Sequence, residues 1–184
     1  MRMPFRIVCR SIAAVALAAT FVPAAQADSD RVAAADLKAA FLLNFVTFTD
    51  WPGIVDAATR VCVVDDPSVA EALSAAVRAR TGSARSIVVD AIAPDAPMRE
   101  CQVLFLGAAN ANHALAMLEQ TAAVPTLTVS DVPHFAESGG MIGLFLAAGK
   151  MRFAVNVDAV QRGRLRLSSR LLSLAKIVKD THAQ

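Results

Sequence analysis

Short runs of aliphatic and β-branched residues alternate along this chain with longer segments of helical periodicity. The runs that we expect to form strands are Val61–Val64, Ser86–Ile92, Cys101–Leu106 and Pro125–Val129. Helical spacing of apolar residues predicts helices at 32–48, 68–80 and 110–121. Strands that alternate with helices are typical of a parallel sheet, because each parallel connection must cross from one end of the sheet to the other. We therefore predict an α/β fold, a single layered domain with a mostly parallel sheet flanked by helices.

The last third of the chain adds a different set of elements. A short helix is expected from about Val132 to Glu137, followed by an antiparallel hairpin at one edge of the sheet. The hairpin strands are Met141–Leu146 and Met151–Val155, and Ala147-Ala148-Gly149 forms the turn between them. Asn156 and Asp158 are suited to cap a short helical turn, and Ser168 or Ser169 is expected to start a final amphipathic helix that continues to Lys179.

The N-terminal 27 residues have the pattern of a secretory signal peptide. Arg2, Arg6 and Arg10 form a positive region, an apolar stretch follows, and Ala25-Gln26-Ala27 has the small residues of a cleavage site. We expect cleavage after Ala27 and a periplasmic mature domain at residues 28–184. No later apolar run in the sequence is long enough to span a membrane.

Charge argues against nucleic acid as a partner. The leader carries three arginines and no acid, so its removal takes the net charge from +2 to −1. A near-neutral exported protein has no global electrostatic attraction to nucleic acid. The basic residues near the C-terminus are interpreted as a solvated face rather than an anion site; they are Arg162, Arg164, Arg166, Arg170, Lys176 and Lys179.

An aromatic stripe runs along the first predicted helix. Phe41, Phe45 and Phe48 recur at steps of three or four, and Trp51 follows before Pro52 and Gly53 end the helix. One face of this helix must bury against the sheet, so we predict that the stripe belongs to the core and not to a partner surface.

Polar residues follow the predicted strands at the ends where an open α/β sheet binds ligands. They are Asp65, Asp66, Gly107, Ser130 and Asp131. A structural role competes with ligand binding, because Asp66 before Pro67 is typical of a helix N-cap with proline at the first helical position. We interpret Asp66 and Asp131 as N-caps.

Catalytic and metal-binding motifs are weak in this sequence, and we assign no catalytic residue, metal site or cofactor. The nearest match to a nucleophile pattern is Ser173-Leu-Ala-Lys176, but its companion motifs are missing and the serine falls on a predicted amphipathic helix. His113, His134 and His182 lack metal-ligand spacing to one another or to a cysteine.

Two cysteines remain after processing, Cys62 and Cys101. In an oxidising compartment an even count favours one disulfide. Two buried free thiols are the alternative, because Cys62 lies in an apolar strand and free cysteine is commonly buried.

The ordered set of motifs resembles the YfiR family of periplasmic proteins. The matching segments are Lys38–Phe45 with Phe48 and Trp51-Pro52, Val61–Pro67, Cys101–Phe105, Thr128–Asp131 with Phe135, 139–142, Arg152-Phe153 before Asn156, and Leu167–Leu172 before Lys176. Together they extend from about Lys38 to Lys179.

The resemblance implies a non-enzymatic regulator. It would bind the periplasmic sensory part of an inner-membrane diguanylate cyclase and repress it, lowering cyclic di-GMP and biofilm formation. An OmpA-like outer-membrane lipoprotein and a homodimer are further implied partners. Some members carry a second cysteine pair near the hairpin, and its absence here leaves only the Cys62–Cys101 bridge to carry over. The alternative is a periplasmic small-molecule-binding module that serves another membrane sensor.

Overall fold

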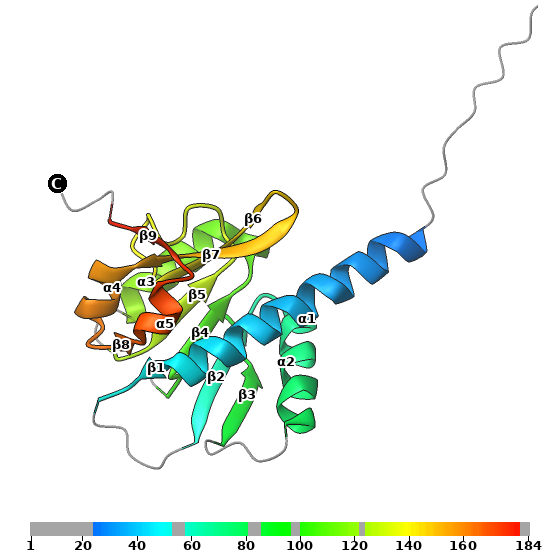
Figure 1. The fold of residues 1–184 in the computed structure, drawn as a ribbon. Coiled ribbons are helices and arrows are strands. Elements are labelled where there is room, and N and C mark those ends of the chain that lie inside the picture. The colour runs from blue at the N-terminus through cyan, green and yellow to red at the C-terminus, as the bar shows by residue number, and fades with distance from the viewer. Residues whose placement is uncertain (1–23, 53–57, 81–85, 97–99, 122–123, 181–184) are drawn as a thin grey trace, which may run out of the picture.

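The computed structural model describes residues 24–52, 58–80, 86–96, 100–121 and 124–180, and the predicted signal peptide lies almost entirely outside them. The helices are α1 (Ala24–Phe48), α2 (Pro67–Ala79), α3 (Ala111–Thr121), α4 (Val157–Arg162) and α5 (Ser169–Leu172), with a 3₁₀ turn at Ala108–Asn110 (Figure 1). The strands are β1 (Thr49–Asp50), β2 (Thr59–Val64), β3 (Ile87–Ala91), β4 (Val103–Leu106), β5 (Leu127–Ser130), β6 (Ile142–Ala147), β7 (Lys150–Asn156), β8 (Arg166–Leu167) and β9 (Lys176–Val178).

A seven-stranded sheet organises the domain, with the order β3-β2-β4-β5-β6-β7-β9. Neighbouring strands are parallel except for β6 and β7, and β1 pairs with β8 in a separate antiparallel sheet of two strands. The α/β prediction is confirmed. Because β2 pairs with both β3 and β4, the order of the parallel strands reverses at β2.

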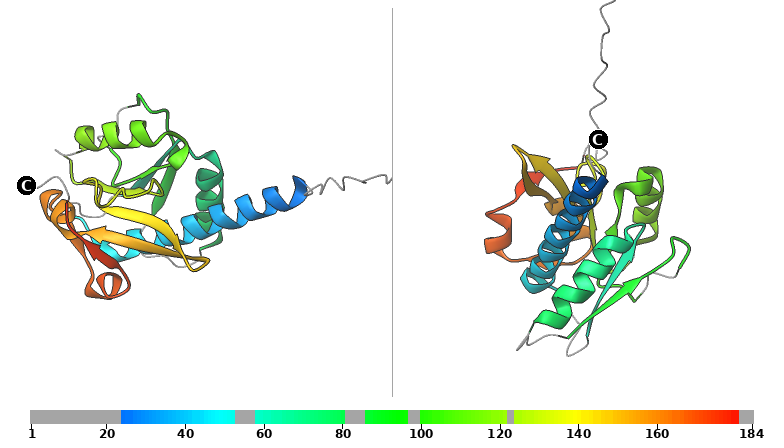
Figure 2. Two further views of the ribbon diagram at one scale, coloured as in Figure 1. Left: turned by 90° about the horizontal axis from the view of Figure 1, so that it is seen from above. Right: turned by 90° about the vertical axis from the view of Figure 1, so that its right-hand side faces the viewer.

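Helices cover both faces of the sheet, as the two views in Figure 2 show. Val61 and Val63 of β2 belong to the larger core, which includes buried residues of α1 and α2. Cys62 and Val64 point to the opposite face and belong to a second core with Ala114 and Met117 of α3. Burial on both faces explains why β2 is a continuous apolar run and not an alternating one.

The aromatic stripe of α1 lies in the larger core, as predicted. Phe45 is fully buried, and its ring centroid lies 5.2 Å from that of Phe153 and 5.9 Å from that of Phe41. Trp51 is buried too, and its Nε1 donates to the carbonyl oxygen of Gln102 at 3.2 Å. Phe41 and Phe48 are only half-buried.

The predicted final helix starts as expected, with Ser168 as its N-cap and Ser169 as its first residue, but its predicted continuation to Lys179 is wrong. α5 ends at Leu172, and Lys176–Val178 instead forms β9, which pairs parallel with Ala154–Asn156 of β7. The β-branched pair Ile177-Val178 suits a strand, and the otherwise open edge of β7 supplies its backbone partners.

The predicted helix at 132–137 is wrong as well. This segment is a series of turns, in which His134 has a φ of 60° and Ser138 N donates to the carbonyl oxygen of His134 at 2.9 Å. A left-handed residue interrupts the helical repeat. The following hairpin forms as predicted, with Ala148 and Gly149 at φ of 50° and 71° in its two-residue turn. It does not form the edge of the sheet, because β9 pairs with β7 on the outer side.

Candidate functional site

The carboxyl ends of β2, β4 and β5 meet at one edge of the sheet, where the strand order reverses. A cleft of about 300 Å³ lies there, lined by Arg31, Ala34, Ala35, Lys38, Asp65, Asp66, Ser68, Ala108, Ala109 and Asp131. The structure therefore brings together the three predicted aspartates Asp65, Asp66 and Asp131. Such a crevice at a topological switch point is the usual ligand position in open α/β sheets.

Lys38 of α1 occupies the centre of the cluster. Its Nζ lies 2.6 Å from Asp131 Oδ2 and 3.1 Å from Asp66 Oδ2, and its side chain is 15% exposed. Burial lowers the pKa of Lys38, but hydrogen bonds and charge from Asp131 and Asp66 outweigh burial and raise that pKa above 10.5. The charged Lys38 side chain therefore links α1 by ion pairs to the residues that follow β2 and β5.

Asp66 has the predicted capping role and a second one. Its Oδ1 accepts from the backbone N–H of Val69 at 3.1 Å, which makes it the N-cap of α2 with Pro67 in the first turn. Its other oxygen binds Lys38. One carboxylate thus links α1 to the start of α2.

Asp131 is not an N-cap, which corrects the prediction. No helix follows it because the 132–140 segment forms turns, and the backbone N–H of Val132 donates to Ser130 Oγ instead. Asp131 Oδ2 binds Lys38, while the buried Oδ1 accepts no hydrogen bond within the described part of the chain. Among the described residues that line this cleft, it is the one fully buried side-chain oxygen without a hydrogen-bond partner.

Gly107 and Asp65 give the cleft its close backbone packing. A Cβ on Gly107 would lie 2.8 Å from the Asp65 carbonyl oxygen and 2.9 Å from Asp66 Cβ, so a side chain is not accommodated here. Asp65 has a φ of 59°, and its carboxylate lies 3.2 Å from His113 Nδ1.

Sequence reasoning did not place Lys38 or Arg31 at this cleft, nor did it predict the contact between His113 and Asp65. Lys38 is the start of the motif that carried the family resemblance, and it lies among alanines and leucines on the buried side of α1. A lysine in such a position is a signal for a paired partner, because lysine is almost never fully buried alone.

The Ser173–Lys176 pattern does not form a nucleophile and base. Ser173 Oγ donates to the carbonyl oxygen of Arg170 at 3.0 Å, and Lys176 lies on β9 with its Nζ 3.4 Å from Glu137 Oε1. The two residues are on different elements because α5 ends before Ser173.

Cys62 and Cys101 are joined in a disulfide with a Cα–Cα distance of 5.8 Å. Both are buried in the core beneath α3, at 1% and 4% exposure. The bridge joins β2 to Cys101, two residues before β4, so we assign it a structural role.

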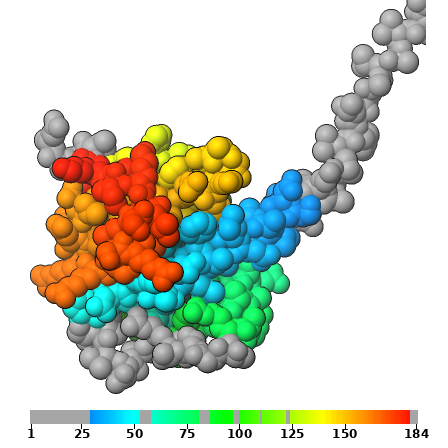
Figure 3. All heavy atoms as spheres, viewed as in Figure 1, coloured from blue at the N-terminus to red at the C-terminus, as the bar shows by residue number. Residues whose placement is uncertain are grey.

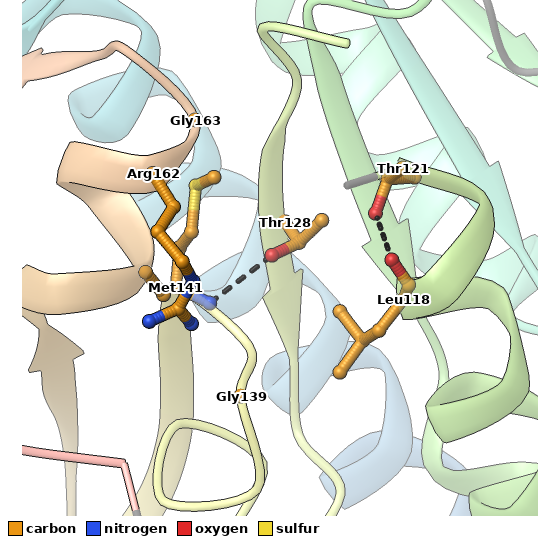
Figure 4. Close-up of a pocket in the computed structure, with 8 residues that line it drawn as sticks. Leu118, Thr121, Thr128, Gly139, Met141, Arg162 and Gly163 are labelled. Atoms are coloured by element: carbon orange, nitrogen blue, oxygen red, sulfur yellow. Dashed lines mark hydrogen bonds between the residues drawn. The ribbon is translucent and has the colours of Figure 1, made fainter. Parts of the chain in front are cut away.

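A second, smaller cavity of about 120 Å³ lies between α3, β5 and α4 (Figure 4). Its polar side chains already have partners: Thr128 Oγ1 accepts from Met141 N at 3.0 Å, and Thr121 Oγ1 donates to the Leu118 carbonyl oxygen at 2.9 Å. At its rim Arg162 pairs with Asp180. We therefore place no ligand there.

The C-terminal basic residues lie on the surface of the domain. Arg162, Arg164, Arg166, Arg170, Lys176 and Lys179 are all exposed. This agrees with the interpretation as a solvated face. Across the described residues, no group of three or more His, Cys, Asp or Glu side chains could hold a metal ion.

Comparison with known families identifies the chain. The YfiR/HmsC-like family matches residues 35–176, from within α1 to the start of β9. Comparison with curated proteins gives no match. Within the residues described, no helix is both long and apolar enough to cross a membrane. The chain therefore belongs to the YfiR/HmsC-like family, a non-catalytic family of periplasmic regulators of cyclic di-GMP signalling.

Proposed function

We propose that this protein binds the periplasmic sensory part of an inner-membrane diguanylate cyclase and represses it, lowering cyclic di-GMP. The observation that supports this proposal most directly is the family match over residues 35–176, which spans the domain from α1 to β9. Export by the predicted signal peptide, with cleavage after Ala27, would deliver residues 28–184 to the compartment of such a partner.

The geometry of the polar groups supports a binding role over an enzymatic one. Lys38 is held between two carboxylates and Ser173 faces a backbone carbonyl, so neither is placed as a nucleophile or base. Repression of a partner by docking requires no catalytic residue.

A small-molecule-binding module is the second candidate, and one observation favours it. The 300 Å³ cleft lies at the carboxyl ends of parallel strands and has the charged side chains of Arg31, Asp65 and Asp131 in its lining, a position suited to a small polar ligand. In this alternative the ligand state of the cleft would be read by another membrane sensor.

Deletion and complementation test the proposal. We expect deletion of the gene to raise cyclic di-GMP and surface attachment, and the wild-type gene to restore both. Ser173→Ala should restore them equally, because its hydroxyl is bonded within α5 and its turn. Unchanged cyclic di-GMP after deletion would contradict the repressor and leave the small-molecule module. Failure of a folded Ser173→Ala protein would point to enzymatic activity.

Direct binding completes the test. Titration calorimetry with purified residues 28–184 and the periplasmic domain of a candidate diguanylate cyclase from the same organism should give a saturable complex. The same titration with an OmpA-like lipoprotein domain tests capture of the regulator, and sedimentation tests the expected homodimer. Mass spectrometry of the exported protein should find Asp28 as its first residue.

A further inference from the structure

An apolar groove separates the N-terminal half of α1 from the β6–β7 hairpin. Its volume is about 510 Å³, and its lining is almost entirely apolar, from Ala33, Ala34, Leu37, Pro133, Leu144, Phe145, Leu146 and Met151, with Lys38 and Asp131 at one end. Figure 3 shows the hairpin (gold) beside the projecting part of α1 (blue).

Large apolar side chains at this groove remain in water. Leu146 is 72% exposed and Leu37 is 43% exposed. Ala33 and Ala34 are too small to fill the gap between the helix and the hairpin. A concave site with exposed leucines is typical of an interaction surface, since isolated exposed leucines do not usually converge.

The groove is bounded by an open strand edge. β5 pairs with β6 only at Ile142 and Gly143, and β6 then continues through Ala147. In the described part of the chain no strand lies beside residues 144–147 on that side, because β7 is on the other.

The direction of the backbone groups follows from the hairpin pairing. Asn156 N donates to the carbonyl oxygen of Met141, so Met141 directs its backbone toward β7. Alternate residues direct their peptide groups to opposite edges, which turns Leu146 toward the open side. Leu146 therefore offers both its side chain and its backbone to whatever fills the groove.

The apolar groove and the open edge of β6 together specify what can bind here. A row of peptide groups is satisfied by another extended backbone, while a helix, a lipid or a compact ligand would leave it unpaired. We propose that an extended peptide segment of a partner protein adds to β6 beside residues 144–147, in line with β5, and places alternate apolar side chains in the groove.

Charge indicates the other side chains of that segment. Cross-strand neighbours share a face, so Arg152 lies on the face of Phe145 and Lys150 lies on the face of Ala147, away from α1. Both basic side chains are exposed. Lys176 is on this face too, with its Nζ 5.9 Å from the Phe145 ring centroid and paired with Glu137. The outward side chains of the added strand are therefore acidic, which gives an apolar-acidic alternation.

A synthetic peptide tests this mode of binding independently of the cyclase. The probe is a fluorescent seven-residue peptide that alternates glutamate and valine, titrated into residues 28–184 and followed by anisotropy. We expect saturable binding of this peptide and weaker binding of a lysine-valine version. Deuterium exchange at the Leu146 amide of the wild-type protein should be slower with the peptide bound than without it. Two further probes carry N-methyl groups on all valines or on all glutamates. Because each blocks one edge of an extended peptide, one should lose at least about tenfold in affinity and the other should bind.

Matched leucine variants locate the site. Leu146→Asp should weaken binding at least about tenfold, whereas Leu174→Asp, at a leucine 68% exposed outside the groove, should bind like the wild type. Absence of saturable binding, equal binding of both N-methylated probes, or equal binding of a peptide with its valines contiguous would overturn strand addition. Self-association that Leu146→Asp abolishes would assign the groove to a second copy, and would also overturn the proposal.

Discussion

Lys38 should contribute more to stability than any exposed lysine, and Lys38→Met tests this. The substitution keeps the aliphatic length and removes the charge, so Asp66 and Asp131 lose their shared cation. Loss of one partner from a buried ion pair costs about 3 to 5 kcal/mol. The two carboxylates are each 19% exposed, so water offsets part of the loss and we expect about 2 to 4 kcal/mol.

Urea denaturation and thermal melting measure the effect. A domain of this size should melt roughly 6 to 12 °C lower. Lys150→Met removes a charge from an exposed position and should remain within about 0.5 kcal/mol of wild type. A double-mutant cycle of Lys38→Met with Asp131→Asn should show a coupling of at least about 1 kcal/mol, because the residues are in direct contact.

The stabilisation by Lys38 should depend on pH at the alkaline end. The pKa of Lys38 is raised above 10.5 in the folded protein, so its contribution is complete below that pH and is lost as pH rises through the folded pKa. The difference between wild type and Lys38→Met should therefore be the same at pH 7 and 9 and smaller at pH 11. Two results would refute a stabilising ion-pair role for Lys38. One is a Lys38→Met variant as stable as wild type, and the other is a stability difference between the two proteins that is as large at pH 11 as at pH 7.

Three further outcomes are expected. Phe45→Ala should lower the free energy of unfolding by about 3 to 5 kcal/mol because the ring is fully buried. Phe145→Ala removes the same ring from a residue that is 36% exposed, and its effect should be far smaller. Equal melting points of the two variants would contradict the assignment of the α1 aromatic stripe to the core. Oxidised protein should show no free thiol from Cys62 or Cys101 in denaturant before reductant is added. Reduction should lower the free energy of unfolding by about 4 kcal/mol for a 39-residue separation, and two titratable thiols in the unreduced protein would contradict the bridge. Gly107→Ala should lower the free energy of unfolding by about 1 to 3 kcal/mol, because the new Cβ would contact the Asp65 backbone. An unchanged urea midpoint would show that the backbone at the cleft can shift to accommodate the Cβ without loss of stability.

Much of the fold could be predicted because its signals are local. Two β-branched or aliphatic runs became β2 and β4, and helical spacing became α2 and α3, within one or two residues of their observed ends. Asp66 before Pro67 capped α2 as its sequence indicated, since a cap needs only the three residues that follow it. Where local signals were ambiguous, as at Ile177 in the predicted final helix, the open edge of β7 decided for a strand.

The sequence by itself determined the α/β class, the strand ends at which polar residues cluster, and the single cysteine pair that is possible within the predicted mature domain. Only the tertiary structure decided that Lys38 meets Asp66, 28 residues away, and Asp131, and that β6 runs on past β5 beside α1. These features depend on the path of α1 across the sheet and on the strand order, which are set by packing between segments far apart in the chain. A local sequence pattern carries no information about such long-range contacts. The ion-pair cluster and the groove therefore form only when the whole domain is assembled.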